Sequence, residues 1–147
     1  MATVSALKRD PAAFYEINLD RWTRFTGVEP NAAHYVLARL EREGLLRGVI
    51  TQNIDGLHSK AGTKQLWEAH GHLRTCRCMD CEQRYPLDFL VNQFNKGTNP
   101  PLCENCGGVL RLDVVLFEDP LGEDFTGAVH AMDKCRLLIV VGSSLTV

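Results

Sequence analysis

Hydrophobic residues recur at helical spacing in two stretches of the chain. In residues 30–43 the apolar positions fall three or four residues apart, on one face of a helix, and they are Ala33, Val36, Leu37 and Leu40. Pro30 suits the first turn of such a helix and Gly44 suits its end. Residues 11–25 show a less regular form of the same pattern. The sequence therefore predicts two helices near the N-terminus.

Two short runs predict buried strands, the first rich in β-branched residues and the second made of continuous, rather than alternating, apolar residues. One covers residues 45–51, directly after the second helix, and the other covers residues 136–141. Continuous apolarity is typical of a parallel strand that is covered on both faces. A helix followed closely by such a strand is half of a parallel α/β unit. We therefore expect an α/β fold with a parallel sheet.

Residues 72–108 have a different composition from the rest of the chain. They hold five of the six cysteines together with several prolines and glycines, and only residues 87–94 show a short helical pattern. We predict that this segment is a small module inserted into the α/β domain. Residues 1–71 and 109–147 would form that domain.

Charge and composition exclude several classes of function. The 147 residues carry 16 Lys and Arg against 18 Asp and Glu, a net charge of -2, so the basic surplus that binds nucleic acid is absent. The longest apolar run, residues 137–141, is far shorter than the about 20 residues of a membrane span. The first ten residues lack the apolar core of a secretory signal. We expect a cytoplasmic protein with reduced cysteines and no nucleic-acid or membrane partner.

Two CxxC pairs predict a metal site. They are separated by 21 residues, and their cysteines are Cys78, Cys81, Cys103 and Cys106. Each pair directs two thiolates to one point, and two pairs complete the tetrahedral shell that zinc prefers. A closed shell leaves no position for water, so one structural zinc in a zinc-ribbon module is predicted. Cys76 forms a CxC with Cys78 and stays an alternative ligand, whereas Cys135 is expected to be a core thiol.

Polar residues follow both predicted strands. Gln52, Asn53 and Asp55 follow the first strand, and Gly142, Ser143 and Ser144 follow the second. Ligands of open α/β sheets bind at the carboxyl ends of strands, but Asn53 and Asp55 could equally satisfy backbone donors in a local turn. The GxGxxG fingerprint of a conventional dinucleotide site is absent from the sequence.

One histidine lies between these features. Glu68-Ala69-His70-Gly71 precedes the cysteine module, and a histidine there can serve as a general base because its pKa is ordinarily near neutrality. A structural role is the alternative for His70. For His34, His72 and His130 the structural role is the expectation.

Together these segments resemble the sirtuin family of NAD-dependent protein-lysine deacylases. The resembling segments occur in the family's order, and they are Pro30-Asn31-Ala32-Ala33-His34, residues 49–58, Ala61-Gly62, Glu68-Ala69-His70-Gly71, the paired CxxC motifs, residues 110–121 and Gly142-Ser143-Ser144-Leu145.

The resemblance implies NAD-dependent deacetylation of acetylated or otherwise acylated protein lysines. In this family the acyl oxygen attacks C1′ of the nicotinamide ribose, nicotinamide leaves, and a ribose hydroxyl then takes over the acyl group to give O-acyl-ADP-ribose. His70 matches the base that activates the ribose hydroxyls. The residues implied to contact NAD are Gln52, Asn53, Asp55, Gly142, Ser143 and Ser144.

The resemblance also implies a substrate strand. The matching positions are Val115, Phe117, Glu118 and Asp119, and residues 113–117 suit pairing with an added peptide strand. A buried strand or linker is the alternative. Family members carry Phe-Gly-Glu where this chain has Phe117-Glu118-Asp119, so Glu118 replaces a conformationally free glycine.

Two family regions have no counterpart in the sequence. One is the Gly-Ala-Gly-Ile-Ser loop with its proline-aspartate-phenylalanine-arginine stretch, which holds the pyrophosphate, and the other is the set of late strands that contact the adenine ribose. The resemblance therefore implies a partial Rossmann-like domain with the zinc-ribbon module inserted, in a chain that we expect to be truncated at both ends. A second hypothesis is a non-catalytic sirtuin-like protein that acts as a zinc-containing interaction module.

Overall fold

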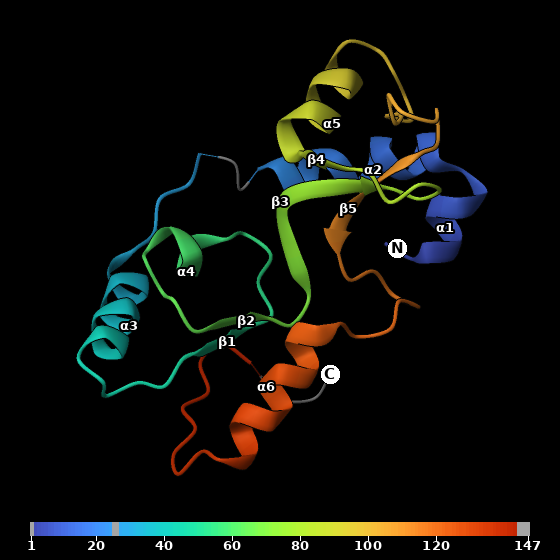
Figure 1. Ribbon diagram of the computed structural model, residues 1–147. Helices are drawn as coiled ribbons and strands as arrows, with labels where there is room; N and C mark the ends of the chain where they lie inside the picture. Colours follow the sequence, from blue (N-terminus) through green and yellow to red (C-terminus); the bar gives the residue numbers. More distant parts are fainter. Residues whose placement is uncertain (1, 25–26, 144–147) are drawn as a thin grey trace.

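The computed structural model describes residues 2–24 and 27–143. Its elements form two parts, and one long strand runs between them (Figure 1). In chain order the elements are α1 (Val4–Arg9), α2 (Pro11–Thr23), α3 (Ala32–Arg42), β1 (Val49–Thr51), α4 (Leu57–Lys60), β2 (Leu66–Glu68), β3 (Gly71–Cys78), β4 (Arg84–Pro86), α5 (Leu87–Asn95), β5 (Leu110–Val114) and α6 (Glu123–Asp133).

The first part is a small parallel sheet with helices. β1 and β2 pair in parallel, with Val49 opposite Leu66 and Thr51 opposite Glu68. α3 contacts α4, and α6 contacts β2. This arrangement confirms the predicted α/β class with a parallel sheet.

The second part is an antiparallel sheet in the order β4-β3-β5. β3 is central, and it starts beside the parallel sheet and bends on its way into the second part (Figure 1). The bend coincides with an irregular register against β5 between Gly71 and Cys76, as expected where an extra residue bulges out of one strand.

The three predicted helices are confirmed, with small differences at their ends. α2 begins with Pro11, and the Asp10 side chain accepts the amide of Ala13 at 3.0 Å. α3 begins after Asn31, whose side chain and that of His34 cap each other's backbone amides, so the structural role expected for His34 is confirmed. Both starts follow the usual chemistry of helix N-caps.

The hydrophobic core lies in the second part. Side chains of α1 and α2 pack against the antiparallel sheet and α5 in a single cluster, whose buried members are Leu7, Phe14, Tyr15, Leu19, Trp22, Leu73, Cys76, Cys78, Leu87, Leu90, Cys103, Leu110, Leu112, Val114 and Leu116. Outside this cluster the buried hydrophobic residues are only alanines within the described ranges: Ala38, Ala69 and Ala128. Most of the burial that stabilises the chain therefore surrounds the cysteine module.

Two strand predictions need correction. Residues 136–141 form no strand and are exposed, with Leu137 76% accessible, because a strand needs paired and covering neighbours that the three-residue β1 and β2 do not supply. Residues 45–48 also stay outside β1. Gly44 ends α3 with a left-handed φ of 75°, and the amides of Leu45 and Leu46 bond back to the carbonyl of Leu40.

Candidate functional site

The four predicted metal ligands converge in the structure. Their Sγ atoms all lie within 4.8 Å of one another. Cys106 Sγ is 3.4 Å from those of Cys78 and Cys81, and Cys81 Sγ is 3.7 Å from that of Cys103. A tetrahedral shell with Zn–S bonds of about 2.3 Å places its sulfurs about 3.8 Å apart. The thiol cluster therefore fits one zinc ion.

Local contacts position the sulfurs for metal binding. The amide of Asp80 donates to Cys78 Sγ at 3.4 Å, and the Tyr85 hydroxyl lies 3.2 Å from Cys103 Sγ. Burial alone would raise the pKa of Cys103, but the hydrogen bonds from Tyr85 and from nearby backbone amides lower it below its usual range. A lowered pKa favours the thiolate, which is the form that ligates zinc.

The other two cysteines lie outside the cluster. Cys76 is fully buried, its thiol faces the carbonyls of Tyr85 and Pro86, and burial raises its pKa to about 12. It is therefore a core thiol. The prediction for Cys135 is wrong, since this residue is exposed and donates to the carbonyl of Leu137 at 2.7 Å. The segment that was expected to bury it forms no strand.

The parallel pairing of β1 and β2 brings two predicted site segments together. Both strands end at the same edge of the sheet, and the amide of Ala69 bonds to the carbonyl of Thr51 at 2.9 Å just beyond the paired residues. Residues 52–55 and His70 follow directly, and the amide of Leu73 reaches the carbonyl of Ile54 at 3.1 Å. His70 itself is half-buried.

Glycine is the only residue type that fits at position 71, next to His70. Its φ is 74°, and a Cβ there would lie 2.2 Å from the carbonyl oxygen of Asp113 on β5. The close approach lets the amide of Val115 donate to the carbonyl of His70 at 2.9 Å. The histidine-glycine pair therefore anchors the segment that follows β5.

The polar loop after β1 combines a local turn with exposed side chains. Asp55 Oδ1 accepts the amide of Leu57 at 2.9 Å, which is the turn contact expected of an aspartate. Gln52 and Asn53 are exposed at the end of the strand. One carboxylate oxygen of Asp55 is thus occupied, while the amide side chains of Gln52 and Asn53 are exposed.

The predicted substrate segment extends β5 outward. Val114 and Leu116 are buried, whereas Val115 is half-buried and Phe117 is 65% exposed, so Val115 and Phe117 share the face away from the core. Asp119 receives two bonds from the guanidinium of Arg111, at 3.1 and 2.6 Å. Burial alone would raise the pKa of Asp119, but these bonds hold it below its usual range.

Comparison with known proteins decides the family. The Sir2 family pattern matches residues 1–147. The chain belongs to the Sir2 family. It is 44% identical over 147 residues to the NAD-dependent protein deacetylase of Sulfurisphaera tokodaii. It is 43% identical over 145 residues to NAD-dependent protein deacetylase 2 of Caldanaerobacter subterraneus subsp. tengcongensis.

Solved Sir2 structures share the fold. The structure of Sir2Tm bound to a propionylated peptide superposes with a TM-score of 0.93 at 34% identity, covering 99% of this chain and 61% of Sir2Tm. The two curated relatives are matched over 99–100% of this chain and 58% of their own length. The chain thus spans somewhat over half the length of these relatives.

The Sir2-like segment at the end of the chain is only partly described. Gly142 has a φ of 70° and is exposed, as is Ser143, while Ser144 lies outside the described residues. Gly142 and Ser143 follow the apolar run that forms no strand.

Sequence reasoning missed an ion pair between residues on either side of His70 in the sequence. Glu68 is buried, and both of its carboxylate oxygens bind the guanidinium of Arg74, at 2.7 and 2.5 Å. The amide of Glu68 also donates to Asp124 at the start of α6, at 2.9 Å. These contacts join β2 to β3 and to α6. The pairing of Glu68 with Asp124 spans 56 residues, so no local pattern could indicate it.

Two histidines of the Sir2-like motifs pack together. The rings of His34 and His58 lie 4.6 Å apart between their centroids. Burial lowers the pKa of His58, and the neighbouring His34 lowers it further. Burial likewise lowers the pKa of His72, with Arg74 adding to the effect. His58 and His72 are therefore neutral in the folded protein at neutral pH.

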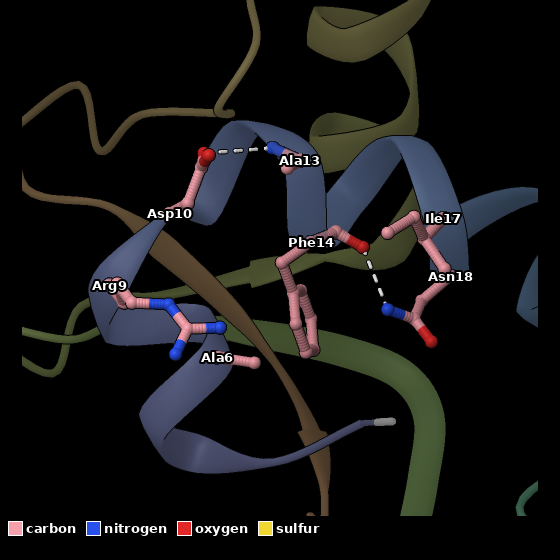
Figure 2. Close-up of a pocket in the computed structure, with 7 residues that line it drawn as sticks. All are labelled: Ala6, Arg9, Asp10, Ala13, Phe14, Ile17 and Asn18. Carbon is pink, nitrogen blue, oxygen red and sulfur yellow. Dashed lines mark hydrogen bonds between the residues drawn. The ribbon is translucent and has the colours of Figure 1, made fainter.

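A shallow hollow of the surface lies away from these segments. It has a volume of about 240 Å³ between α1 and α2, and its lining residues are Ala6, Arg9, Asp10, Ala13, Phe14, Ile17 and Asn18 (Figure 2). None of them is a predicted site residue. Within residues 2–24 and 27–143, no helix has both the length and the apolarity to cross a membrane.

Proposed function

We propose that this chain carries the reaction centre of an NAD-dependent protein-lysine deacetylase, which transfers the acyl group of acyl-lysine to ADP-ribose and releases nicotinamide. The observation that supports it is a pair of backbone hydrogen bonds around His70. The amide of Ala69 donates to the carbonyl of Thr51, just before the polar loop of residues 52–55, and the amide of Val115 in the substrate segment donates to the carbonyl of His70. The predicted base therefore lies between the predicted NAD-binding loop and the predicted substrate strand.

Each residue in this arrangement has a proposed task. NAD supplies the ribose carbon that accepts the acyl oxygen as nicotinamide departs. His70 accepts the proton of a ribose hydroxyl, for which imidazole is suited near neutral pH. Gln52 and Asn53 offer amide donors and acceptors to the ribose and nicotinamide, and Asp55 has one carboxylate oxygen beyond its turn contact. Gly142, Ser143 and Ser144 are proposed as further NAD contacts.

The partner is an acetylated or otherwise acylated lysine in a protein. Val115 and Phe117 share the outward face of the extended segment, which suits packing on the lysine stem while the peptide backbone adds as a strand. The zinc held by the four cysteines is proposed to be structural, since four thiolates leave no open position. A cytoplasmic location, and the division into residues 1–71 with 109–147 and residues 72–108, stay predictions.

Nicotinamide release tests the proposal. The zinc-loaded chain should release nicotinamide from NAD only when an acetyl-lysine peptide is present, and His70→Ala should abolish the release. His130→Ala is the matched control, because His130 is exposed on α6 and should keep the activity. The absence of release from folded, zinc-loaded wild-type protein would refute activity for this chain.

A second candidate is a non-catalytic, zinc-containing interaction module. The packing of the main core around the cysteine module favours it, since that part of the chain could present the segment 115–119 without NAD. Calorimetric titration separates the two functions. Saturable heat on adding NAD supports the enzyme, whereas peptide binding without any NAD heat supports the module.

A further inference from the structure

Glu118 has a backbone conformation that needs an explanation. Its φ is 78°, in the left-handed region that L side chains rarely adopt. The family carries glycine at this position, and glycine tolerates that conformation freely. Only one other non-glycine residue in the described ranges, Glu82 in the turn after Cys81, has a positive φ. Some interaction must therefore hold Glu118 in place.

The side chain of Glu118 supplies that interaction. Its Oε2 accepts the backbone amide of Ser5 at 2.8 Å, and its Oε1 accepts the Ser5 hydroxyl at 3.0 Å. Ser5 lies in the first turn of α1, where backbone amides have no partner within the helix. A carboxylate there gains both the hydrogen bonds and the favourable field of the helix N-terminus.

The neighbouring backbone forms part of the same contact. The amide of Val4 donates to the carbonyl of Phe117 at 3.0 Å, and the amide of Phe117 donates to the carbonyl of Ala2 at 3.0 Å. Both backbone polar groups of Phe117 are thus bound to the N-terminal segment, while its side chain is exposed. At the other end of the segment, Val115 is bound to His70.

From these contacts we infer that Ser5 and Glu118 form a latch that positions the acyl-lysine-binding segment, residues 115–119. The inference rests on the proposed function of that segment. The Glu118 carboxylate is bound to Ser5, and the Asp119 carboxylate is bound to Arg111. Both acids are therefore positioning residues rather than substrate contacts, and they leave Val115 and Phe117 to meet the peptide.

Peptide affinity tests the latch in the zinc-loaded full chain. An acetyl-lysine peptide with a fluorescent label should bind Glu118→Ala with a Kd at least about fivefold above wild type, because two hydrogen bonds to a charged group are lost. Ser5→Ala keeps the backbone amide and should lose less peptide affinity than Glu118→Ala. Ser5→Thr keeps both donors and should bind the peptide with wild-type affinity. The double variant of Ser5→Ala with Glu118→Ala should bind no worse than Glu118→Ala.

Glu82→Ala is the matched control. Glu82 has the same residue type, a φ of 59° and an ion pair with Arg77 at 3.2 Å, but it lies in the cysteine module. It should leave the peptide Kd unchanged, and zinc content should be the same in every variant. Equal peptide affinity in wild type and Glu118→Ala would overturn the inference.

Hydrogen exchange separates the latch from the proposed function. The amides of Val4, Ser5 and Phe117 should be protected in wild type and Glu82→Ala and should exchange faster in Glu118→Ala. If wild type binds no acetyl-lysine peptide, the proposed substrate is refuted while the exchange data still decide whether the latch exists. Unchanged exchange in Glu118→Ala would refute the latch whatever the peptide does.

Discussion

The replacement of Gly71 by alanine should be far more damaging than its size suggests. Gly71 and Gly44 have almost the same φ, 74° and 75°, but an added Cβ at Gly44 would meet nothing within 4 Å. At Gly71 the added carbon would lie 2.2 Å from the oxygen of Asp113 and 3.0 Å from Cα of Val114. These are backbone atoms of β5, so they cannot rotate away.

The structure allows the two costs to be separated. A left-handed alanine costs about 1–2 kcal/mol at either position. At Gly71 the strands must also move apart, which adds about 1–3 kcal/mol of overpacking and about 0.5–1.5 kcal/mol for each weakened backbone hydrogen bond. Gly71→Ala should therefore lower the free energy of unfolding by about 3–5 kcal/mol, and Gly44→Ala by about 1–2 kcal/mol.

Urea unfolding of the zinc-loaded proteins, followed by circular dichroism, measures both values. The peptide assay should also detect Gly71→Ala, because the bond from Val115 to His70 depends on this close approach. Equal losses of stability in the two variants would show that backbone conformation alone sets the requirement for glycine at position 71. The steric account of the histidine-glycine pair would then be wrong.

Three further predictions concern the metal site and pH. Cys103→Ser should release zinc and unfold the cysteine module, because metal binding and folding are one equilibrium at such sites; retained zinc by elemental analysis would contradict the ligand assignment. Tyr85→Phe removes the hydroxyl 3.2 Å from Cys103 Sγ and should increase the rate of zinc loss to a chelator about tenfold, whereas an unchanged rate would mean that this contact does not support the metal. Burial lowers the pKa of His58 and of His72. As pH falls below about 6.5, these two histidines therefore bind protons in the unfolded chain before they do so in the folded protein. Stability should be constant above that pH and decline below it, and substituting both histidines by glutamine should flatten the decline in urea titrations between pH 7 and 5; an unaltered slope would assign it to other groups.

The parts of the fold that were predictable have local causes. The helix at residues 30–43 was evident because one face of a helix repeats every three or four residues, and the cysteine ligands were evident because each CxxC pair is a complete local knuckle. β3 was not evident, since its buried residues Leu73, Cys76 and Cys78 break the alternation of a regular strand at the bulge. The apolar run 136–141 shows which residues would gain from burial, but no local pattern can supply the partner strand.

The candidate site shows the same distinction between local patterns and long-range contacts. The sequence indicated His70 and the polar loop because they follow predicted strand ends or matched a family motif. The contacts that place the segments of the site are long-range: Ser5 meets Glu118 across 113 positions, and the amide of Glu68 reaches Asp124 across 56. The departure of Glu118 from glycine was visible in the sequence, but its partner could be found only in three dimensions.

Strand β3 runs from the parallel sheet, which has few large buried hydrophobic side chains, into the part of the molecule that contains the hydrophobic core. Local unfolding should therefore begin at the parallel sheet, where buried side chains are small, and stop near Cys76 and Cys78. Zinc ligation then holds the Cys78 end of β3 in place, while the other end of this strand adjoins His70. Local opening around the proposed reaction centre should in this way proceed without loss of the metal, whereas loss of the metal should release the whole strand.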